Sequence, residues 1–486
     1  MLYQHYTTSE LKSSEKLAYL IKKEDRMMLG CKAMSGISVT KLSNKYNINR
    51  QFIYEQKNKV HDILEKEFDK SENKYSVLIL DEQIIEKTII ACMIICKGSE
   101  TDAQEFMEEV YKIHVSIGKI SEIINKASDK ALEWNNSIKL ENITTGANDE
   151  IFQGNTPVLV GVDPLSTYAY LMQETENRDS TTWGYVLLEK SKLGLDLKTS
   201  VNDGGTGLNK GIKEAFPDAV IQADVFHSEK DISFGVGSFE RKAFKDINAE
   251  YKAEKKYLGS KSDTDKKYDE YKSAILKCQN SISIYDKAKI LYGWVIEIFA
   301  IGGYCYEEKK ELLSFIVKEM EALPDTNAYW KKGIRFLAEN SEGLLQFIKK
   351  AEILIAAFSE EQNVDKKVLS QMWKQRQYSY SSIEYNKLEG EIGIQLGERY
   401  NEIHEKWNHM LKQIVRASSI VECINSLIRP YLFLKRVVPG KFLDLLQFYF
   451  NTRKYKRSRI KERIGKSPVE LLTGKSFENP LSILGY

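Results

Sequence analysis

Three acidic residues from widely separated parts of this 486-residue chain carry the pattern with the most chemical content. Asp149 and Asp203 lie in segments with strand-like patterns, and Glu422 follows a long helical stretch. Carboxylate oxygens are the ligands that Mg²⁺ prefers, and a few of them can hold two divalent cations against a phosphodiester. Asp149, Asp203 and Glu422 therefore suit a two-metal site, provided that the fold brings them together.

Asp203 precedes Gly204 and Gly205, where small residues allow a sharp turn that leaves the carboxylate open to a cleft. A glycine-rich phosphate loop over residues 204–211 is the rival interpretation. The Gly-x4-Gly-Lys-Ser/Thr pattern of such loops is absent, which disfavours it.

Glu422 is expected on a helix that runs from about residue 402 to 428, on one face with Asn425 and Arg429 at i+3 and i+7. A carboxylate, an amide and a guanidinium in this order suit a metal, a sugar-phosphate and a phosphate. Taken alone, the spacing is also typical of a solvated helix face.

The elements that must position these side chains change character at about residue 140. Three strand-like segments (143–152, 157–163 and 167–173) precede a helix at 181–192 capped by Ser180, a strand at 197–202, a helix at 207–216 and a strand at 219–226. This order is that of a ribonuclease-H-like domain. Because that fold carries its first carboxylate on its first strand, Asp149 is favoured over Asp163, which stays an alternative.

The domain plan is a multidomain α+β protein. We expect a helix-turn-helix domain at 1–70, a second helical domain at 71–140 and the first part of a ribonuclease-H-like core at 141–230. An all-α insertion should follow at 231–400, because this stretch has no strand signals and is too long for a loop. Its dispersed Trp294, Trp330 and Trp373 are expected mostly in its core. Residues 401–486 should complete the core with the glutamate helix and a basic tail.

The N-terminal region contains a three-helix pattern in which Asn49 can cap the third helix. That helix presents Arg50, Gln51, Tyr54 and Lys57, which can reach base edges or phosphates. The pattern favours DNA binding, although a plain three-helix packing unit has the same apolar spacing. Residues 85–124 repeat it, with Ser116 as the third cap.

A second basic candidate lies near the C-terminus, with Tyr455 interleaved and Glu462 as its only acid. Its side chains suit salt-dependent, sequence-independent binding of phosphates. The candidates are Arg453, Lys454, Lys456, Arg457 and Arg459.

Composition limits these hypotheses without choosing among them. The net charge of +2 means that any nucleic-acid surface is a local patch. Six cysteines without a Cys-x-x-Cys pair argue against a disulfide framework or a zinc site. No signal peptide or membrane-spanning segment is expected, so the predicted location is the cytoplasm, which in a cell without a nucleus gives access to the chromosome.

Four blocks together resemble the signature blocks of DDE transposases from bacterial insertion sequences, akin to the Mutator and hAT groups with their helical insertion and Cys/Asp-x-x-His tetrad. The blocks are residues 148–152, 200–205, 224–227 and 419–425, and the tail from 451 to 472 is similar as well. The resemblance covers roughly residues 145–475. It implies that Asp149, Asp203 and Glu422 are catalytic metal ligands and that Asp224 and His227 form the accessory tetrad.

The resemblance further implies metal-dependent strand cleavage and 3′-hydroxyl strand transfer at transposon ends, with two Mg²⁺ ions that Mn²⁺ can replace. Double-stranded DNA, both transposon end and target, would be the partner, and a homodimer or larger assembly would join two ends. Two alternatives remain open. One is a domesticated transposase that binds specific DNA without strand transfer, and the other is a structure-specific DNA nuclease.

Overall fold

The computed structural model describes residues 21–68, 80–303, 305–324, 327–434 and 440–486. The chain forms two compact units, residues 1–127 with 481–486 and residues 128–480. The extreme N-terminus, expected to lack a signal peptide, lies outside the described residues. Within the described ranges, every helix is too short or too polar to cross a bilayer.

The first unit begins with a three-helix cluster that contains α1 (Lys23–Met34), α2 (Val39–Tyr46) and α3 (Arg50–Phe68). Leu29, Leu42 and Ile53 pack in its core. As predicted, the Asn49 side chain accepts a hydrogen bond from the backbone amide of Gln51 at 2.8 Å at the start of α3. The three-helix pattern of the sequence is therefore present.

Three further helices follow, as the second repeat predicted: α4 (Glu82–Ile94), α5 (Glu100–Tyr111) and α6 (Ile117–Ser137). Asp81 and Ser99 cap α4 and α5, and the Ser116 hydroxyl accepts from the Lys119 amide at 3.3 Å. The first half of α6 belongs to the first unit and its end to the second.

The second unit contains a mixed sheet, so the α+β class is confirmed. Within the described residues its strand order is β3-β2-β1-β4-β5, with β1 antiparallel to β2 and parallel to β4. The strands are β1 (Thr145–Gln153), β2 (Thr156–Val162), β3 (Ala169–Glu174), β4 (Thr199–Asn202) and β5 (Val220–Ala223).

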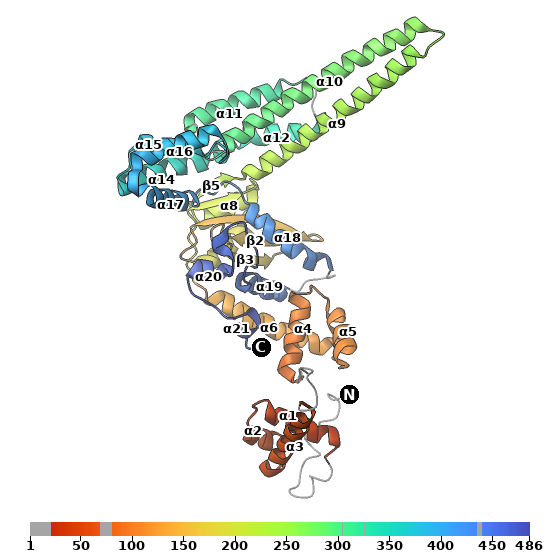
Figure 1. The fold of residues 1–486 in the computed structure, drawn as a ribbon, viewed down its shortest axis with the longest axis vertical. Coiled ribbons are helices and arrows are strands. Elements are labelled where there is room, and N and C mark those ends of the chain that lie inside the picture. The colour runs from red at the N-terminus through yellow and green to blue at the C-terminus, as the bar shows by residue number, and fades with distance from the viewer. Residues whose placement is uncertain (1–20, 69–79, 304, 325–326, 435–439) are drawn as a thin grey trace. The chain divides into compact units, whose positions relative to one another are not determined.

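Helices cover both faces of this sheet (Figure 1). On one face, α7 (Ser180–Ser191) and α8 (Thr206–Ala215) bury Trp183, whose indole nitrogen donates to Glu150 of β1 at 3.1 Å. On the other lie α18 (Ser419–Leu434) and α19 (Gly440–Thr452), packed against β1 and β3. Since side chains alternate along a strand, Asp149 faces α18 while Glu150 faces α7.

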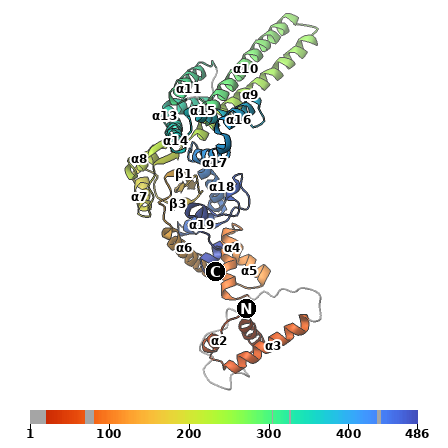
Figure 2. The ribbon, with the colours of Figure 1, turned by 60° about the vertical axis from the view of Figure 1, so that its left-hand side comes forward.

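Between β5 and α18 the chain is helical, as predicted for an insertion. The long α9 and α10 form an antiparallel hairpin, seen as the projecting helix pair in Figures 1 and 2. The helices are α9 (Val225–Leu258), α10 (Thr264–Phe299), α11 (Tyr306–Glu321), α12 (Ala328–Glu339), α13 (Ser341–Leu344), α14 (Gln346–Gln362), α15 (Lys366–Gln375), α16 (Ile383–Leu396), η2 (Gly397–Arg399) and α17 (Tyr400–Leu411).

Most of the insertion's large side chains share one core. Trp330 and Trp373 are buried in it, as predicted, whereas Trp294 is 42% exposed and lies beside Phe315. The chain then closes with η3 (Lys461–Arg463), α20 (Pro468–Thr473) and α21 (Pro480–Ile483).

Three sequence predictions about these elements were wrong. Asp179, not Ser180, caps α7, because its carboxylate accepts from the Thr182 amide. The last strand ends at Ala223, and Asp224 caps α9, so the insertion's first helix begins before residue 231. The expected helix at 402–428 is divided into α17, which ends at Leu411, and α18, which begins at Ser419; the hydroxyl of Ser418, just before α18, donates to Asp224.

The close approach of α7 and α8 generates a stability prediction. A Cβ on Gly211 would lie 2.5 Å from Trp183 Cβ and 2.7 Å from the Ser180 carbonyl oxygen. Gly211→Ala should therefore cost about 1–3 kcal/mol through overpacking and lower the thermal unfolding midpoint. Gly293→Ala is the matched control, since nothing lies within 4 Å there. It should leave the midpoint unchanged or raise it, because alanine favours helices. Equal midpoints for the two variants would contradict this packing.

Candidate active site

The first two carboxylates start from neighbouring strands. Ala147 of β1 pairs with Val201 of β4, so Asp149 and Asp203 each stand two residues further along two parallel neighbours. Adjacent strands lie about 4.8 Å apart, which brings the two side chains to one sheet edge. Asp203 is exposed at the turn after β4, where Gly204 has a φ of +88°, as the two glycines predicted.

Helix α18 brings the third carboxylate to this edge. The amide nitrogen of Asn425 donates to Asp149 Oδ2 at 2.7 Å, and the backbone amide of Glu150 donates to Asp149 Oδ1 at 2.8 Å. Glu422, one turn earlier on α18, has a 25% exposed side chain and lies 3.5 Å from an Arg429 nitrogen. Asp149, Asp203, Glu422 and Asn425 are hereafter the carboxylate cluster.

The electrostatics of Asp149 reflect this crowding. Burial, together with the negative charges of Asp203 and Glu422, raises the pKa of the Asp149 carboxyl to about 7. The Glu150 amide and His227 act in the opposite direction. Mutual repulsion of this kind is what a bound cation would relieve, since opposite charge nearby favours the ionised form.

The donor set of the cluster fits divalent cations with hard character. All of its ligand atoms are oxygens, which Mg²⁺ and Mn²⁺ accept. Asn425 Oδ1 is also buried without a hydrogen-bond partner beside these carboxylates. Among the described residues, one group holds three potential metal-ligand atoms within 4.8 Å of one another: His61, Asp62 and Glu65, which are exposed on α3. The oxygen atoms of Asp149, Asp203 and Glu422 are therefore not all within 4.8 Å of one another, too far apart to bind a single ion together. Two ions about 4 Å apart require carboxylates that are spaced more widely.

Asp163, the alternative first carboxylate, lies elsewhere. Its side chain accepts hydrogen bonds from the amides of Leu165 and Ser166 at 3.2 and 2.9 Å and from the Ser166 hydroxyl. These bonds hold the turn between β2 and β3. The residue is 3% exposed, near the start of β1, and its acceptors are committed to this turn.

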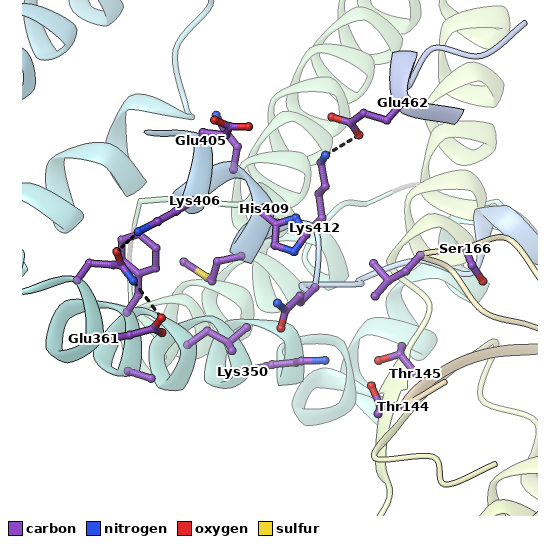
Figure 3. A pocket seen from close by; sticks show the side chains of 18 of the residues that line it. Thr144, Thr145, Ser166, Lys350, Glu361, Glu405, Lys406, His409, Lys412 and Glu462 are labelled. Carbon is purple, nitrogen blue, oxygen red and sulfur yellow. Dashed lines mark hydrogen bonds and ion pairs between the residues drawn. The ribbon is translucent and has the colours of Figure 1, made fainter. Parts of the chain in front are cut away.

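Asp163 instead borders a large cleft of about 1510 Å³ between the sheet and helices α14 and α17 (Figure 3). Several charges in this cleft are already paired or hydrogen-bonded. Lys412 contacts Glu462 at 2.7 Å, and Lys406 contacts Gln362 at 2.8 Å. The cleft is separate from the carboxylate cluster: it is lined by Thr144 and Thr145 at the start of β1, and no residue of the cluster lines it.

Asp224 and His227 lie next to the cluster. Asp224 is fully buried and accepts from the Phe226 amide at 2.8 Å, from His227 Nδ1 at 3.0 Å and from the Ser418 hydroxyl. The hydrogen bond to Asp224, with smaller contributions from Asp203 and Asp149, raises the pKa of His227 above its usual value. Asp224 thus joins the start of α9 to the residue that precedes α18.

The residues predicted to contact DNA have mixed positions. Arg50, Gln51 and Tyr54 are exposed on α3, and Lys57 is half-buried. Arg429 is also exposed. Asn425 is a correction: it is fully buried and donates to Asp149, so it positions a carboxylate and does not offer its amide to DNA.

The C-terminal basic residues Arg453, Lys454, Lys456, Arg457 and Arg459 are all exposed. Lys454 is 3.1 Å from the buried Glu470, so its charge serves a structural ion pair. Tyr455 anchors the segment through a 2.6 Å hydrogen bond to Thr167. The side chains of the other four residues, Arg453, Lys456, Arg457 and Arg459, are exposed to solvent.

Sequence reasoning missed two residues of this region. Ser418 binds Asp224 and caps α18, although serine as a helix cap is a readable signal. Arg178 forms an ion pair with Glu150 at 2.6 Å, and the negative charge of Asp203 contributes to raising the pKa of its guanidinium. This guanidinium is therefore near the cluster. A lone arginine in a loop gave no sequence signal.

The cluster generates a metal-binding prediction. Millimolar Mg²⁺ or Mn²⁺ at neutral pH should raise the unfolding midpoint of the protein by a few degrees, because ligand at about 100 Kd stabilises by ~2.7 kcal/mol. Asp149→Asn should abolish this shift by removing a ligand charge.

Asp163→Asn is the matched control for that measurement. It weakens the β2–β3 turn, so the starting midpoint should fall, but the metal-induced shift should persist. A shift lost in Asp163→Asn and kept in Asp149→Asn would reverse the assignment of the first carboxylate.

Comparison with known proteins gives little further information. No family model matches the chain, and no curated protein is similar to it. Among solved structures, the chain is similar to "Drosophila P element transposase strand transfer complex", with 12% identity over 68% of this chain and 95% of that chain. The TM-score is 0.31, too low for this likeness to carry an argument about fold or function.

Proposed function

We propose that this protein is a DNA transposase of the DDE type, which cleaves DNA strands and transfers 3′-hydroxyl ends in a metal-dependent reaction. The observation that supports the proposal best is that Asp149 and Asp203 stand at matching positions of two neighbouring strands. Helix α18, which carries Glu422 and follows a long insertion, packs on β1 and donates a hydrogen bond to Asp149 through Asn425. The spacing of the three resembles the signature of this class.

The sheet supports a ribonuclease-H-like core for the proposed enzyme. Three antiparallel strands in sequence are followed by two parallel ones, and the first carboxylate lies on the central strand β1. Helices cover both faces, and the glutamate helix packs directly on β1. We infer the predicted domain plan with one changed boundary: the insertion begins with α9 at Val225 and lies between β5 and the glutamate helix α18.

Asp149, Asp203 and Glu422 would hold two Mg²⁺ ions, or Mn²⁺ in their place. Such ions activate an attacking water or 3′-hydroxyl and stabilise the leaving oxygen in an in-line displacement. The chain's own residues prepare the site. Asn425 and the Glu150 amide fix both oxygens of Asp149, and Asp224 holds His227 beside the cluster. No protein nucleophile is needed for either step.

Double-stranded DNA is the proposed partner, both as transposon end and as target. Side chains that suit phosphate binding lie exposed in the same unit as the cluster: Arg429, Arg178 and the C-terminal Arg453, Lys456, Arg457 and Arg459. Lys454, also predicted for this role, is engaged by Glu470. The exposed face of α3 suits reading of base edges. Because two ends have to be joined, the proposed active form is a homodimer or larger assembly, acting on the bacterial nucleoid in the cytoplasm.

The decisive assay is incubation of the purified protein with duplexes carrying the element's ends, with Mg²⁺ or Mn²⁺, followed by separation of cleaved and joined products. Glu422→Gln should lower both by at least ~100-fold, because even outer-shell partners of metal ligands contribute 10–100-fold. DNA affinity should stay unchanged. Glu405→Gln, an exposed glutamate on α17, is the control and should retain full activity.

The outcomes of this assay separate the candidate functions. Cleaved without joined products would favour a structure-specific nuclease. Binding without cleavage with either metal would favour a domesticated DNA-binding protein. Strand transfer by Glu422→Gln at the wild-type rate would contradict the assignment of the third carboxylate.

Helix α3 generates a separate prediction about sequence reading. Gln51→Ala should relax the preference at one base pair by about 1–3 kcal/mol, measured by selection of bound duplexes from a random pool. Lys59, exposed on another face of α3, provides the control Lys59→Ala, which should leave the selected sequence unchanged. An identical selected sequence for both variants would exclude Gln51 as a base reader.

A further inference from the structure

Helix α9 separates its charges onto different faces. Arg241, Lys245, Lys252 and Lys256 are all exposed and follow one another at intervals of about four, seven and four residues. At 3.6 residues per turn these positions fall within one narrow sector of the helix. The four residues are hereafter the basic stripe.

Near the start of the same helix, Asp231 pairs with Lys332 of α12 at 2.9 Å. Further along, Glu240, Asp246 and Glu250 lie on the side of α10. Glu240 accepts a hydrogen bond from the Tyr285 hydroxyl at 3.2 Å, and Glu250 interacts with the Cys278 thiol. Asp246 is buried between the two helices, with Ser281 and Lys277 as partners. In the described part of the chain, none of these acids forms an ion pair with the basic stripe. The stripe is therefore a line of uncompensated positive charge.

The stripe is connected rigidly to the carboxylate cluster. Helix α9 runs without interruption from Val225 to Leu258 and is braced along its length by α10. Its first turn carries His227, which is hydrogen-bonded to Asp224 at 3.0 Å. The negative charges of Asp203 and Asp149 contribute to raising the pKa of His227. By helical periodicity His227 lies in the same sector as the stripe. The face of α9 that begins at the cluster thus continues outward as the stripe.

We propose that the basic stripe binds the phosphate backbone of the duplex segment that leads away from the carboxylate cluster. The inference rests on the proposed function only in placing the reacting phosphodiester at that cluster. Lysine and arginine side chains in a straight, unpaired row complement a polyanion, and their contacts carry no sequence information. The surface therefore suits any DNA sequence.

The geometry also sets a distance along the DNA. Arg241 lies about 14 residues beyond His227 and Lys256 about 29, which correspond to ~21 and ~44 Å along the helix axis. At about 3.4 Å per base pair, these distances reach roughly 6 to 13 base pairs from the cluster. The stripe would thus hold DNA beyond the reach of the active-site residues.

The test measures DNA affinity without chemistry. Binding of a fluorescent 30-base-pair duplex of arbitrary sequence is followed by anisotropy in EDTA at several salt concentrations. The variant Arg241→Gln, Lys245→Gln, Lys252→Gln, Lys256→Gln should bind at least ~10-fold more weakly at low salt. Its slope of log affinity against log salt should fall by roughly 3 to 4, because each lost phosphate contact removes about 0.9.

A matched variant removes the same four charges elsewhere in the helical insertion: Lys318→Gln, Lys331→Gln, Lys366→Gln, Lys367→Gln. These lysines are exposed on α11, α12 and α15. This variant should keep the wild-type slope. Equal losses in the two variants, or no loss in either, would overturn the proposal. Because neither measurement requires cleavage, a protein that binds through the stripe but never cuts DNA would refute the proposed function alone.

Discussion

The hydrogen bonds of the buried Asp224 carboxylate hold the candidate site together. This one side chain caps α9, orients His227 and accepts from Ser418, the cap of the helix that carries Glu422. A backbone bond from Val225 to the Arg416 carbonyl lies beside it at 3.1 Å. The two ends of the helical insertion therefore meet at one point. These contacts lie beside the packing of α18 on β1.

Docking of α18 concentrates negative charge, and that concentration has a cost. Asp149 is half-buried near Asp203 and Glu422. Its raised pKa reflects the free-energy cost of ionising its carboxyl group there. Natural proteins retain such unfavourable arrangements mainly at functional sites. The side-chain amide of Asn425, which donates to Asp149, and the positive charge of protonated His227 offset part of the repulsion between the three carboxylates. Divalent cations would offset the remainder, which links the electrostatics to the proposed chemistry.

Local signals in the sequence predicted much of the fold. The alternation of apolar residues placed β1 to β5 within a few residues, and Asn49 and Ser116 marked helix starts correctly. Counting strands before the first helix favours Asp149 over Asp163 as the first carboxylate, and the structure agrees with the strand count while using the Asp163 side chain in the turn after β2. Two errors are local, since Asp179 and Asp224 cap α7 and α9 one to a few residues away from the expected helix starts. The others concern tertiary contacts. The break before α18 and the burial of Asn425 depend on Asp224 and Asp149, which are distant in sequence. No local pattern reports such contacts.

The measurement that tests the central claim most directly is electron paramagnetic resonance of Mn²⁺ titrated into the protein with duplex DNA. The account predicts two Mn²⁺ ions per chain with the magnetic coupling expected of ions about 4 Å apart, and loss of that coupling in Asp203→Asn. Uncoupled Mn²⁺ bound only at the exposed His61, Asp62 and Glu65 group, or no bound Mn²⁺, would contradict the account.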